Sequence, residues 1–154
     1  MNTQKMQSQQ EEPIWVCIIL RRGNQILMEK RGPEAKRAAG RLTCFGGKRE
    51  TNEQPLACVL RECQEELQWR PSPDVTQHVC ALYVDQKLIA YFYLAPGPTA
   101  EEETTLVYEP GRQGVWIEEE NVTELESVSP WHTSVFEALK QGRTRADFIT
   151  ADTR

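Results

Sequence analysis

Long hydrophobic runs are missing from this chain of 154 residues. The longest, Ile14–Leu20, has seven residues, whereas a membrane-spanning helix needs about 20, so we expect no membrane span and no membrane partner. Residues 1–12 are polar and lack the apolar stretch of a signal peptide. We therefore expect these residues to form a flexible polar tail, and the protein to be cytoplasmic.

Cysteine pairs are missing as well. The five cysteines are an odd number and none of them forms a C-x-x-C pair. This pattern excludes a disulfide framework and a cysteine-based zinc site, and it favours reduced thiols in a cytosolic protein. With 39% hydrophobic and 27% charged residues, the chain has the composition and length of one globular domain.

A broad basic surface is the third absence, because the formal net charge is −5. This argues against a nucleic-acid polymer as a partner. The charge is uneven: residues 21–50 contain nine basic and three acidic residues, and residues 51–154 contain eight basic and eighteen acidic residues. An anionic ligand that arrives with metal ions fits this separation, although on charge alone two ordinary solvated faces are the better interpretation.

Helical and strand periodicities alternate along the chain. Residues 55–67 form the clearest helix, because Leu56, Leu60, Cys63 and Leu67 make one apolar stripe, and Pro55 suits the first turn. A second helix is predicted at 131–141, and strands are predicted at 14–21, 25–31, 42–45, 75–84, 87–95 and 114–118.

This order of elements predicts one α/β domain. Strands on both sides of a central helix, followed by a late helix, indicate a sandwich around a mixed sheet. We place the domain at residues 13–145 and expect residues 146–154 to be a short C-terminal tail.

Three glutamates lie on one side of the predicted helix 55–67. Successive residues turn by about 100°, so Glu62, Glu65 and Glu66 share a narrow arc beside the apolar stripe. Carboxylates this close repel one another, and a divalent cation such as Mg²⁺ or Mn²⁺ turns that repulsion into attraction. A solvated acidic surface is the alternative interpretation of the three glutamates alone.

The spacing of the whole segment decides between the two interpretations. It fits G-x5-E-x7-R-E-U-x-E-E-x-G-U, where U is apolar, with Gly47, Glu53, Arg61, Glu62, Cys63, Glu65 and Glu66 in place. Six fixed matches arise by chance on the order of once per 10⁵ chains of this length. The segment resembles the signature of the Nudix (MutT-like) hydrolases. That resemblance implies a Nudix-type α/β/α sandwich around a mixed β-sheet.

The resemblance also implies an activity and a set of site residues. Nudix enzymes hydrolyse a phosphoanhydride bond in a nucleoside diphosphate linked to another group, with Mg²⁺ or Mn²⁺ as cofactor. Carried over to this chain, Glu62 is the candidate base and metal ligand. Further implied ligands are Glu65, Glu66 and the backbone carbonyl of Gly46. A charge pair between Glu53 and Arg61 would tie the loop to the helix.

One further ligand is expected outside the helix. In the family a carboxylate often comes from a loop before the late strand. Our candidate is Glu109, which lies seven residues before Trp116 in a Pro-Gly loop.

One position departs from the pattern. Gln68 stands where the family has glycine. The helix must end there, because Pro71 disfavours the α region at residue 70. A residue just past a helix end commonly adopts the left-handed conformation. We therefore predict a positive φ at Gln68.

The substrate is expected to be a small nucleotide. The turn Phe45-Gly46-Gly47-Lys48 resembles that of the oxidised-purine triphosphatases, which favours a nucleoside triphosphate yielding monophosphate and pyrophosphate. The substrate-binding candidates are Lys48, Arg31 and Trp131. An inactive Nudix ligand-sensing module and an RNA 5′-end pyrophosphohydrolase remain as alternatives, and the sequence leaves a homodimer open.

Overall fold

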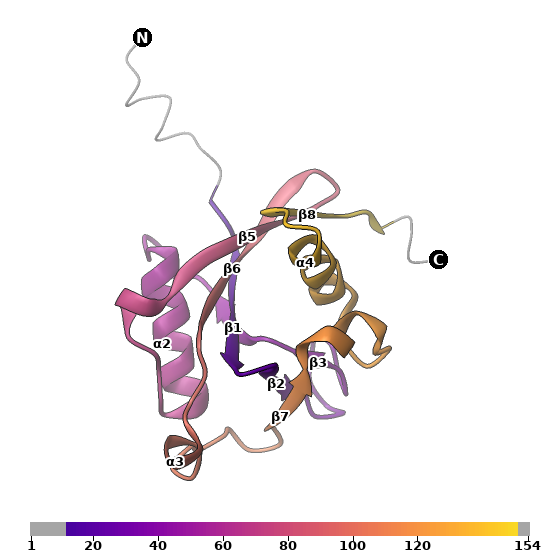
Figure 1. Ribbon diagram of the computed structural model, residues 1–154. Coiled ribbons are helices and arrows are strands. Elements are labelled where there is room, and N and C mark those ends of the chain that lie inside the picture. Colours follow the sequence, from indigo (N-terminus) through magenta and orange to yellow (C-terminus); the bar gives the residue numbers. More distant parts are fainter. Residues whose placement is uncertain (1–11, 151–154) are drawn as a thin grey trace.

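The computed structural model describes residues 12–150. The described residues form an eight-stranded mixed sheet with helices on both faces (Figure 1). The strands are β1 (Trp15–Arg22), β2 (Gln25–Lys30), β3 (Leu42–Thr43), β4 (Phe45–Lys48), β5 (Gln77–Val84), β6 (Lys87–Pro96), β7 (Gln113–Glu118) and β8 (Arg145–Phe148). The helices are α2 (Pro55–Leu67), α3 (Ala100–Glu103) and α4 (Pro130–Lys140), with 3₁₀ turns at Pro73–Val75 and Glu119–Glu124. The predicted N-terminal tail lies outside this range except for Glu12.

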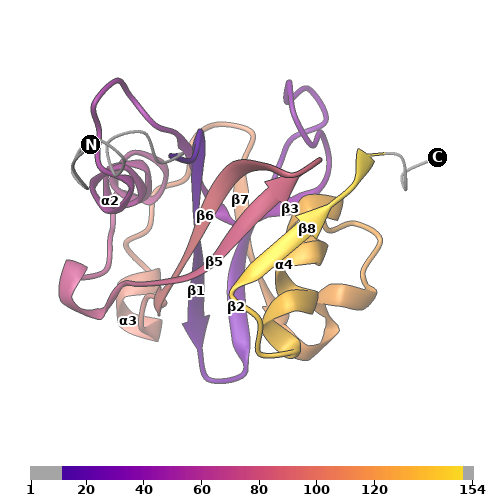
Figure 2. The same cartoon turned by 90° about the horizontal axis from the view of Figure 1, so that it is seen from above.

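The sheet has the order β3-β2-β1-β6-β5-β8, with β4 also pairing β1 and β7 pairing β2. Two of these pairs, β1 with β6 and β5 with β8, are parallel, while the remaining pairs are antiparallel. Figure 2 shows β8 running alongside β5 near α4. The sheet is therefore mixed, as the sequence predicted.

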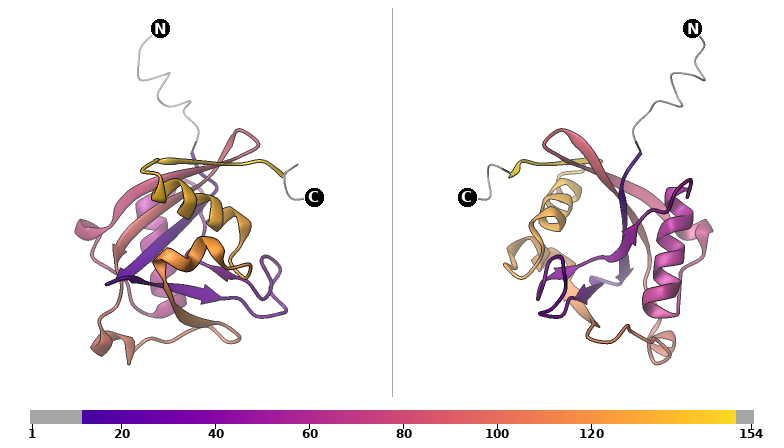
Figure 3. Two further views of the ribbon diagram at one scale, coloured as in Figure 1. Left: turned by 45° about the vertical axis from the view of Figure 1, so that its right-hand side comes forward. Right: turned by 180° about the vertical axis from the view of Figure 1, so that it is seen from behind.

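The helices α2 and α4 cover opposite faces of this sheet (Figure 3). The alternation of β1 explains how one strand serves both layers, since successive side chains point to opposite faces. Val16, Ile18 and Leu20 pack with the buried face of α2, whereas Ile19 packs with Phe136 of α4. Two apolar layers result, and the predicted α/β/α sandwich is confirmed.

Most of the predicted elements agree closely with the structure. The helix at 55–67 has the predicted bounds, and α4 begins one residue earlier than expected. The single strand expected at 42–45 is instead two strands, because the chain leaves β2 after Thr43 and pairs with β1 from Phe45 onward. No helix among residues 12–150 is long and apolar enough to cross a membrane.

The expected C-terminal tail needs a correction. Residues 145–148 form β8, whose backbone pairs with residues 81–84 of β5. Within this strand, Ala146 is buried and packs in the apolar core beside α4. Residues 146–148 thus belong to the folded domain, because pairing with a distant strand stabilises a segment whose own pattern is too short to predict.

Candidate active site

The helix α2 fixes the direction of the three predicted glutamates. Its apolar face, which includes Cys58, Val59 and Cys63, is buried against the sheet. This packing leaves Glu62 partly buried, Glu65 exposed and Glu66 only 4% exposed. The three carboxylates therefore meet different environments although they come from one turn and a half of helix.

The end of α2 has the predicted geometry. Gln68 has φ 52° and ψ 36°, which is the left-handed region, and its N–H donates to the carbonyl of Gln64. The prediction of a positive φ at Gln68 is confirmed. The helix thus ends at Leu67, one residue after Glu66, without a glycine at the following position.

Gly46 and Gly47, expected as a turn, are paired residues of β4, and they lie against these carboxylates. The N–H of Gly46 donates to Oε1 of Glu66 at 3.0 Å. A Cβ atom on Gly47 would overlap the carboxylate of Glu62. Gly47 thus lets the strand approach the helix closely, whereas a Cβ atom on Gly46, at φ 151°, would overlap the backbone of Val16 and Cys17 in β1.

Arg61 joins four carboxylates on the outer side of α2, and we call this group the Arg61 cluster. Its Nε and Nη2 atoms donate to both oxygens of Glu53 at 2.7 and 2.9 Å, which is the pair expected from the sequence. Its Nη1 atom donates to Glu62 at 3.1 Å and to Glu65 at 3.0 Å, and Glu50 lies 3.8 Å from Nε. The hydrogen bonds from Arg61 lower the pKa of Glu53 to about 2.

A second group, the Arg112 cluster, lies on the side of α2 that faces the sheet, which we call its inner side. One atom, Nη1 of Arg112, is 3.1 Å from Glu66, 3.3 Å from Glu29 and 3.7 Å from Glu109. Burial, reinforced by the neighbouring Glu29, raises the pKa of Glu66 to about 8. Burial also raises the pKa of Glu29.

Sequence reasoning missed Glu29 and Arg112 as site residues. A weak signal existed for Glu29, since strand alternation places it on the same face as Leu27, which packs in the α2 layer. A charged residue on a buried face is unusual and indicates a partner or a ligand. Arg112 carried no comparable signal.

The side chains of this region fit a divalent cation chemically. As they stand, no three His, Cys, Asp or Glu side chains among residues 12–150 form a group that could hold a metal ion; arginines lie between the carboxylates instead. Nevertheless, the donors are carboxylate oxygens, which Mg²⁺ and Mn²⁺ prefer. Moreover, Oε1 of Glu29 is buried and accepts no hydrogen bond, so this region has an unused oxygen ligand.

A cavity of about 530 Å³ opens beside Gly46 and Gly47. Cys17, Ala90 and Phe92 contribute to its apolar lining, while Arg31 and Trp131, both predicted from the sequence, lie in its wall. Burial raises the pKa of the Cys17 thiol to about 12, so this cysteine is protonated and no nucleophile. Lys48, the third substrate candidate, is exposed at the end of β4 and does not line the cavity.

His132 of α4 also lines this cavity. Neither ring nitrogen has a hydrogen-bond partner among the described residues, although both are buried. Burial lowers the pKa of His132 to about 3, so the imidazole is neutral at ordinary pH. A neutral imidazole without partners is a costly group to bury, and it can both donate and accept a hydrogen bond.

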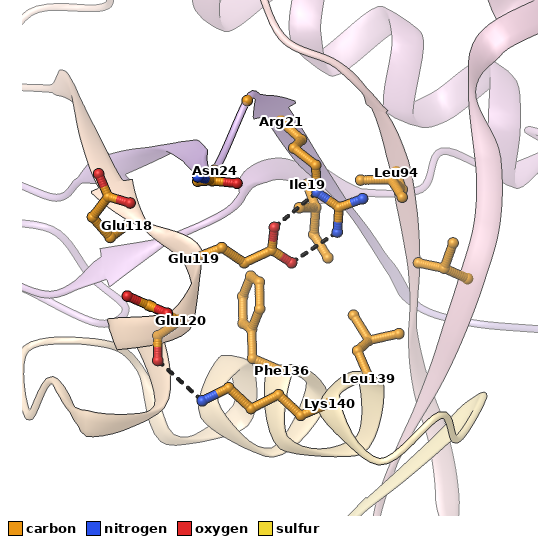
Figure 4. A pocket seen from close by; sticks show the side chains of 12 residues that line it. Ile19, Arg21, Asn24, Leu94, Glu118, Glu119, Glu120, Phe136, Leu139 and Lys140 are labelled. Carbon is orange, nitrogen blue, oxygen red and sulfur yellow. Dashed lines mark hydrogen bonds and ion pairs between the residues drawn. The ribbon is translucent and has the colours of Figure 1, made fainter.

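A second cavity, of about 660 Å³, lies at the other end of α4 (Figure 4). Both of its basic side chains already have partners. Arg21 donates to both oxygens of Glu119 at 2.8 and 2.7 Å, and Lys140 donates to the carbonyl of Glu120 at 3.0 Å. This cavity contains none of the candidate site residues.

Comparison with protein families decides the relationship. Residues 11–144 match the model of the NUDIX domain family. The chain belongs to the Nudix family. The Nudix segment from Gly47 to Glu66 accordingly lies at the turn and helix described above, and Gln68 is its one departure from the pattern.

Solved structures of Nudix proteins have the same fold. The chain is similar to the MutT protein of Methanosarcina mazei Go1, with 19% identity over 86% of this chain and 97% of that one and a TM-score of 0.68. The E. coli ORF135 protein has 23% identity over 82% and 87%, with a TM-score of 0.63. A MutT Nudix hydrolase from Burkholderia pseudomallei has 23% identity over 82% and 96%, with a TM-score of 0.60. At these identities the likeness concerns the fold. Among curated proteins none matches the sequence.

Proposed function

We propose that the chain is a cytoplasmic Nudix pyrophosphohydrolase that uses Mg²⁺ or Mn²⁺ to cleave a phosphoanhydride bond in a nucleoside diphosphate linked to another group. A nucleoside triphosphate, cleaved to monophosphate and pyrophosphate, is the favoured substrate. The observation that supports this most strongly is the approach of Gly46 and Gly47 of β4 to Glu66 and Glu62, next to a cavity of nucleotide size.

The proposed roles follow from the environment of each group. Glu62, Glu65, Glu66 and the Gly46 carbonyl would hold the cation, and Glu109 would approach from the opposite side. A bound divalent cation supplies positive charge to the pyrophosphate oxygens and lowers the pKa of the attacking water.

Glu62 is the proposed base. Burial raises its pKa above the ordinary value, which makes its carboxylate a stronger proton acceptor. It takes one proton from water as the water oxygen attacks phosphorus and the bridging P–O bond breaks. Arg61 and Glu53 position it, because Arg61 contacts both carboxylates.

The cavity supports recognition of a nucleobase. Trp131 offers an aromatic surface for stacking, and His132 offers hydrogen-bonding nitrogens that now lack partners. Arg31 lies 3.7 Å from Glu29 and also lines the cavity, so it stands between the carboxylates and the proposed base site. A phosphate group of a nucleotide that reaches from the base site to the carboxylates would contact Arg31. Lys48 would contact phosphate from the end of β4.

A substrate panel tests the proposal. Ribo- and deoxynucleoside triphosphates, oxidised purine triphosphates and nucleotide sugars are incubated with Mg²⁺ or with excess EDTA, and released phosphate and pyrophosphate are measured. We expect pyrophosphate from a triphosphate, with Mg²⁺ only. Undiminished activity in EDTA would contradict the metal role. Binding without any hydrolysis would favour a ligand-sensing module. Preference for 5′-triphosphate RNA, with binding that weakens steeply with salt, would favour the RNA alternative.

A further inference from the structure

The Arg112 guanidinium occupies an unusual position for a structural ion pair. A single nitrogen, Nη1, faces carboxylates from three separate parts of the chain: Glu29 of β2, Glu66 of α2 and Glu109 of the loop before β7. Hydrogen bonds are present to Glu66 and Glu29 only, at 3.1 and 3.3 Å. A small positive centre surrounded by three carboxylates from different elements has the arrangement of a cation site.

Arg112 only partly compensates the buried negative charge of the Glu29 carboxylate. The Glu29 side chain is 1% exposed, and its Oε1 accepts no hydrogen bond. The nearest other cation is Arg31, whose Nε lies 3.7 Å from Oε1. A buried carboxylate oxygen without a hydrogen-bond donor is unfavourable. Because β2 pairs with both β3 and β7 at this residue, the backbone holds Glu29 in place.

We propose that Arg112 is an internal counter-ion that holds Glu29, Glu66 and Glu109 together in the metal-free protein, and that a divalent cation displaces it, with Glu29 becoming a ligand beside Glu66. This inference rests on the proposed metal-dependent function and adds a residue and a competing cation to that site.

The geometry allows such an exchange. Ligand oxygens lie about 2.0–2.1 Å from Mg²⁺, so Glu66 and Glu29, at 3.1 and 3.3 Å from Nη1, need to move inward by about 1 Å. Arg112 is 29% exposed and therefore has a path to solvent. Arg112 lies between Gly111, at φ 80°, and the first residue of β7, so its side chain comes from the loop and not from the paired strand.

Mn²⁺ binding to the full chain without nucleotide tests the proposal, read from the electron paramagnetic resonance signal of free Mn²⁺. Arg112→Gln removes the competing charge and should tighten binding about 10-fold. Arg112→Lys retains a charge and should bind close to the wild-type level. Glu29→Gln keeps the shape but removes a ligand charge, and it should weaken binding about 10-fold. Circular dichroism and melting temperature check that each variant is folded.

The matched control is Arg21→Gln. Arg21 also forms a partly buried ion pair with a glutamate, but it has no contact with the Arg112 cluster. The Arg21→Gln variant therefore measures how far the loss of one positive charge alone changes Mn²⁺ affinity. If Arg112→Gln binds Mn²⁺ no more tightly than Arg21→Gln, or if Glu29→Gln binds as well as the wild type, the inference is wrong.

The outcomes separate this inference from the proposed function. Wild-type protein that binds Mn²⁺ and hydrolyses nucleotides, together with an unchanged Arg112→Gln affinity, overturns the exchange alone. Absence of Mn²⁺ binding in the wild type and in every variant overturns both. The exchange and the metal-dependent activity are thus tested by separate measurements.

Discussion

Arg61 and Arg112 each bridge carboxylates that include residues of α2, but their geometries differ. Arg61 engages both oxygens of Glu53 through two nitrogens, at 2.7 and 2.9 Å. Arg112 uses one nitrogen for two glutamates, at 3.1 and 3.3 Å. The two-nitrogen arrangement is the stronger and more specific one.

The carboxylates respond in opposite directions. In the Arg61 cluster the pKa of Glu53 falls to about 2, since the arginine hydrogen bonds outweigh burial. In the Arg112 cluster the pKa of Glu66 rises to about 8, since burial and Glu29 outweigh the arginine. Glu53 is therefore satisfied by Arg61 and supports the scaffold, whereas Glu66, and Glu62 with its raised pKa, are not satisfied by their arginines. This contrast favours a cation beside Glu66 and Glu62, and it favours a structural role for the Glu53–Arg61 pair.

The largest expected effect comes from Glu62, a member of the Arg61 cluster and the proposed base. Glu62→Gln keeps the side-chain shape and removes the charge, so turnover should fall about 10²-fold or more with the fold intact. Pyrophosphate release with Mg²⁺ measures the change. Glu101→Gln, the same substitution in an exposed acidic run, is the control and should leave turnover unchanged. A Glu62→Gln enzyme with wild-type activity would show that neither cluster belongs to the active site.

A smaller effect is expected from Glu53→Gln, which weakens the satisfied cluster. Loss of a charged hydrogen-bonded pair should lower the free energy of unfolding by about 2 kcal/mol at pH 7. Because the folded-state pKa of Glu53 is about 2, below the ordinary 4.5, this stabilisation is complete above pH 4.5 and is lost as the pH falls towards 2.

Urea unfolding of both proteins across this pH range measures the difference. The gap between wild type and Glu53→Gln should close as the pH falls. Glu50→Gln is the matched control, because Glu50 is 70% exposed and lies 3.8 Å from Arg61, and such exposed pairs contribute little. A gap that stays constant with pH would mean that Glu53 stabilises the fold by packing instead of by its charge.

The smallest effect concerns Gln68, which follows the last residue of α2. Its left-handed conformation costs about 1 kcal/mol relative to glycine, so Gln68→Gly should raise the free energy of unfolding by up to about 1 kcal/mol. The greater unfolded-state entropy of glycine reduces this gain. Gln68→Ala retains the Cβ strain and should give no such gain. If Gln68→Gly instead destabilises the protein in urea unfolding, the glutamine side chain makes a contact that outweighs the strain.

The local parts of this site could be predicted from the sequence. The bounds of α2 follow from one apolar stripe, and the spacing of Glu53 and Arg61 places them together. The left-handed Gln68 follows from the end of the stripe and Pro71. Each of these inferences concerns residues near one another in the chain, where helix geometry sets the distances.

The long-range parts could not be predicted. Arg112 and Glu29 are separated by 83 positions, and only the pairing of β7 with β2 brings them together. The same holds for β8, whose four residues form a strand only through pairing with β5. Glu109 was proposed from its loop and stands 3.7 Å from Arg112, so it lies at the edge of the cluster. Its role as a ligand remains a prediction.

The proposed metal site is tested most directly by anomalous diffraction from crystals of the wild-type protein grown with Mn²⁺. We predict an anomalous peak at about 2.0–2.2 Å from the carboxylates of Glu62 and Glu66 and from the Gly46 carbonyl, with Arg112 turned away. Mn²⁺ bound only at the exposed acidic run of residues 101–103, with no peak at α2, would contradict the assignment.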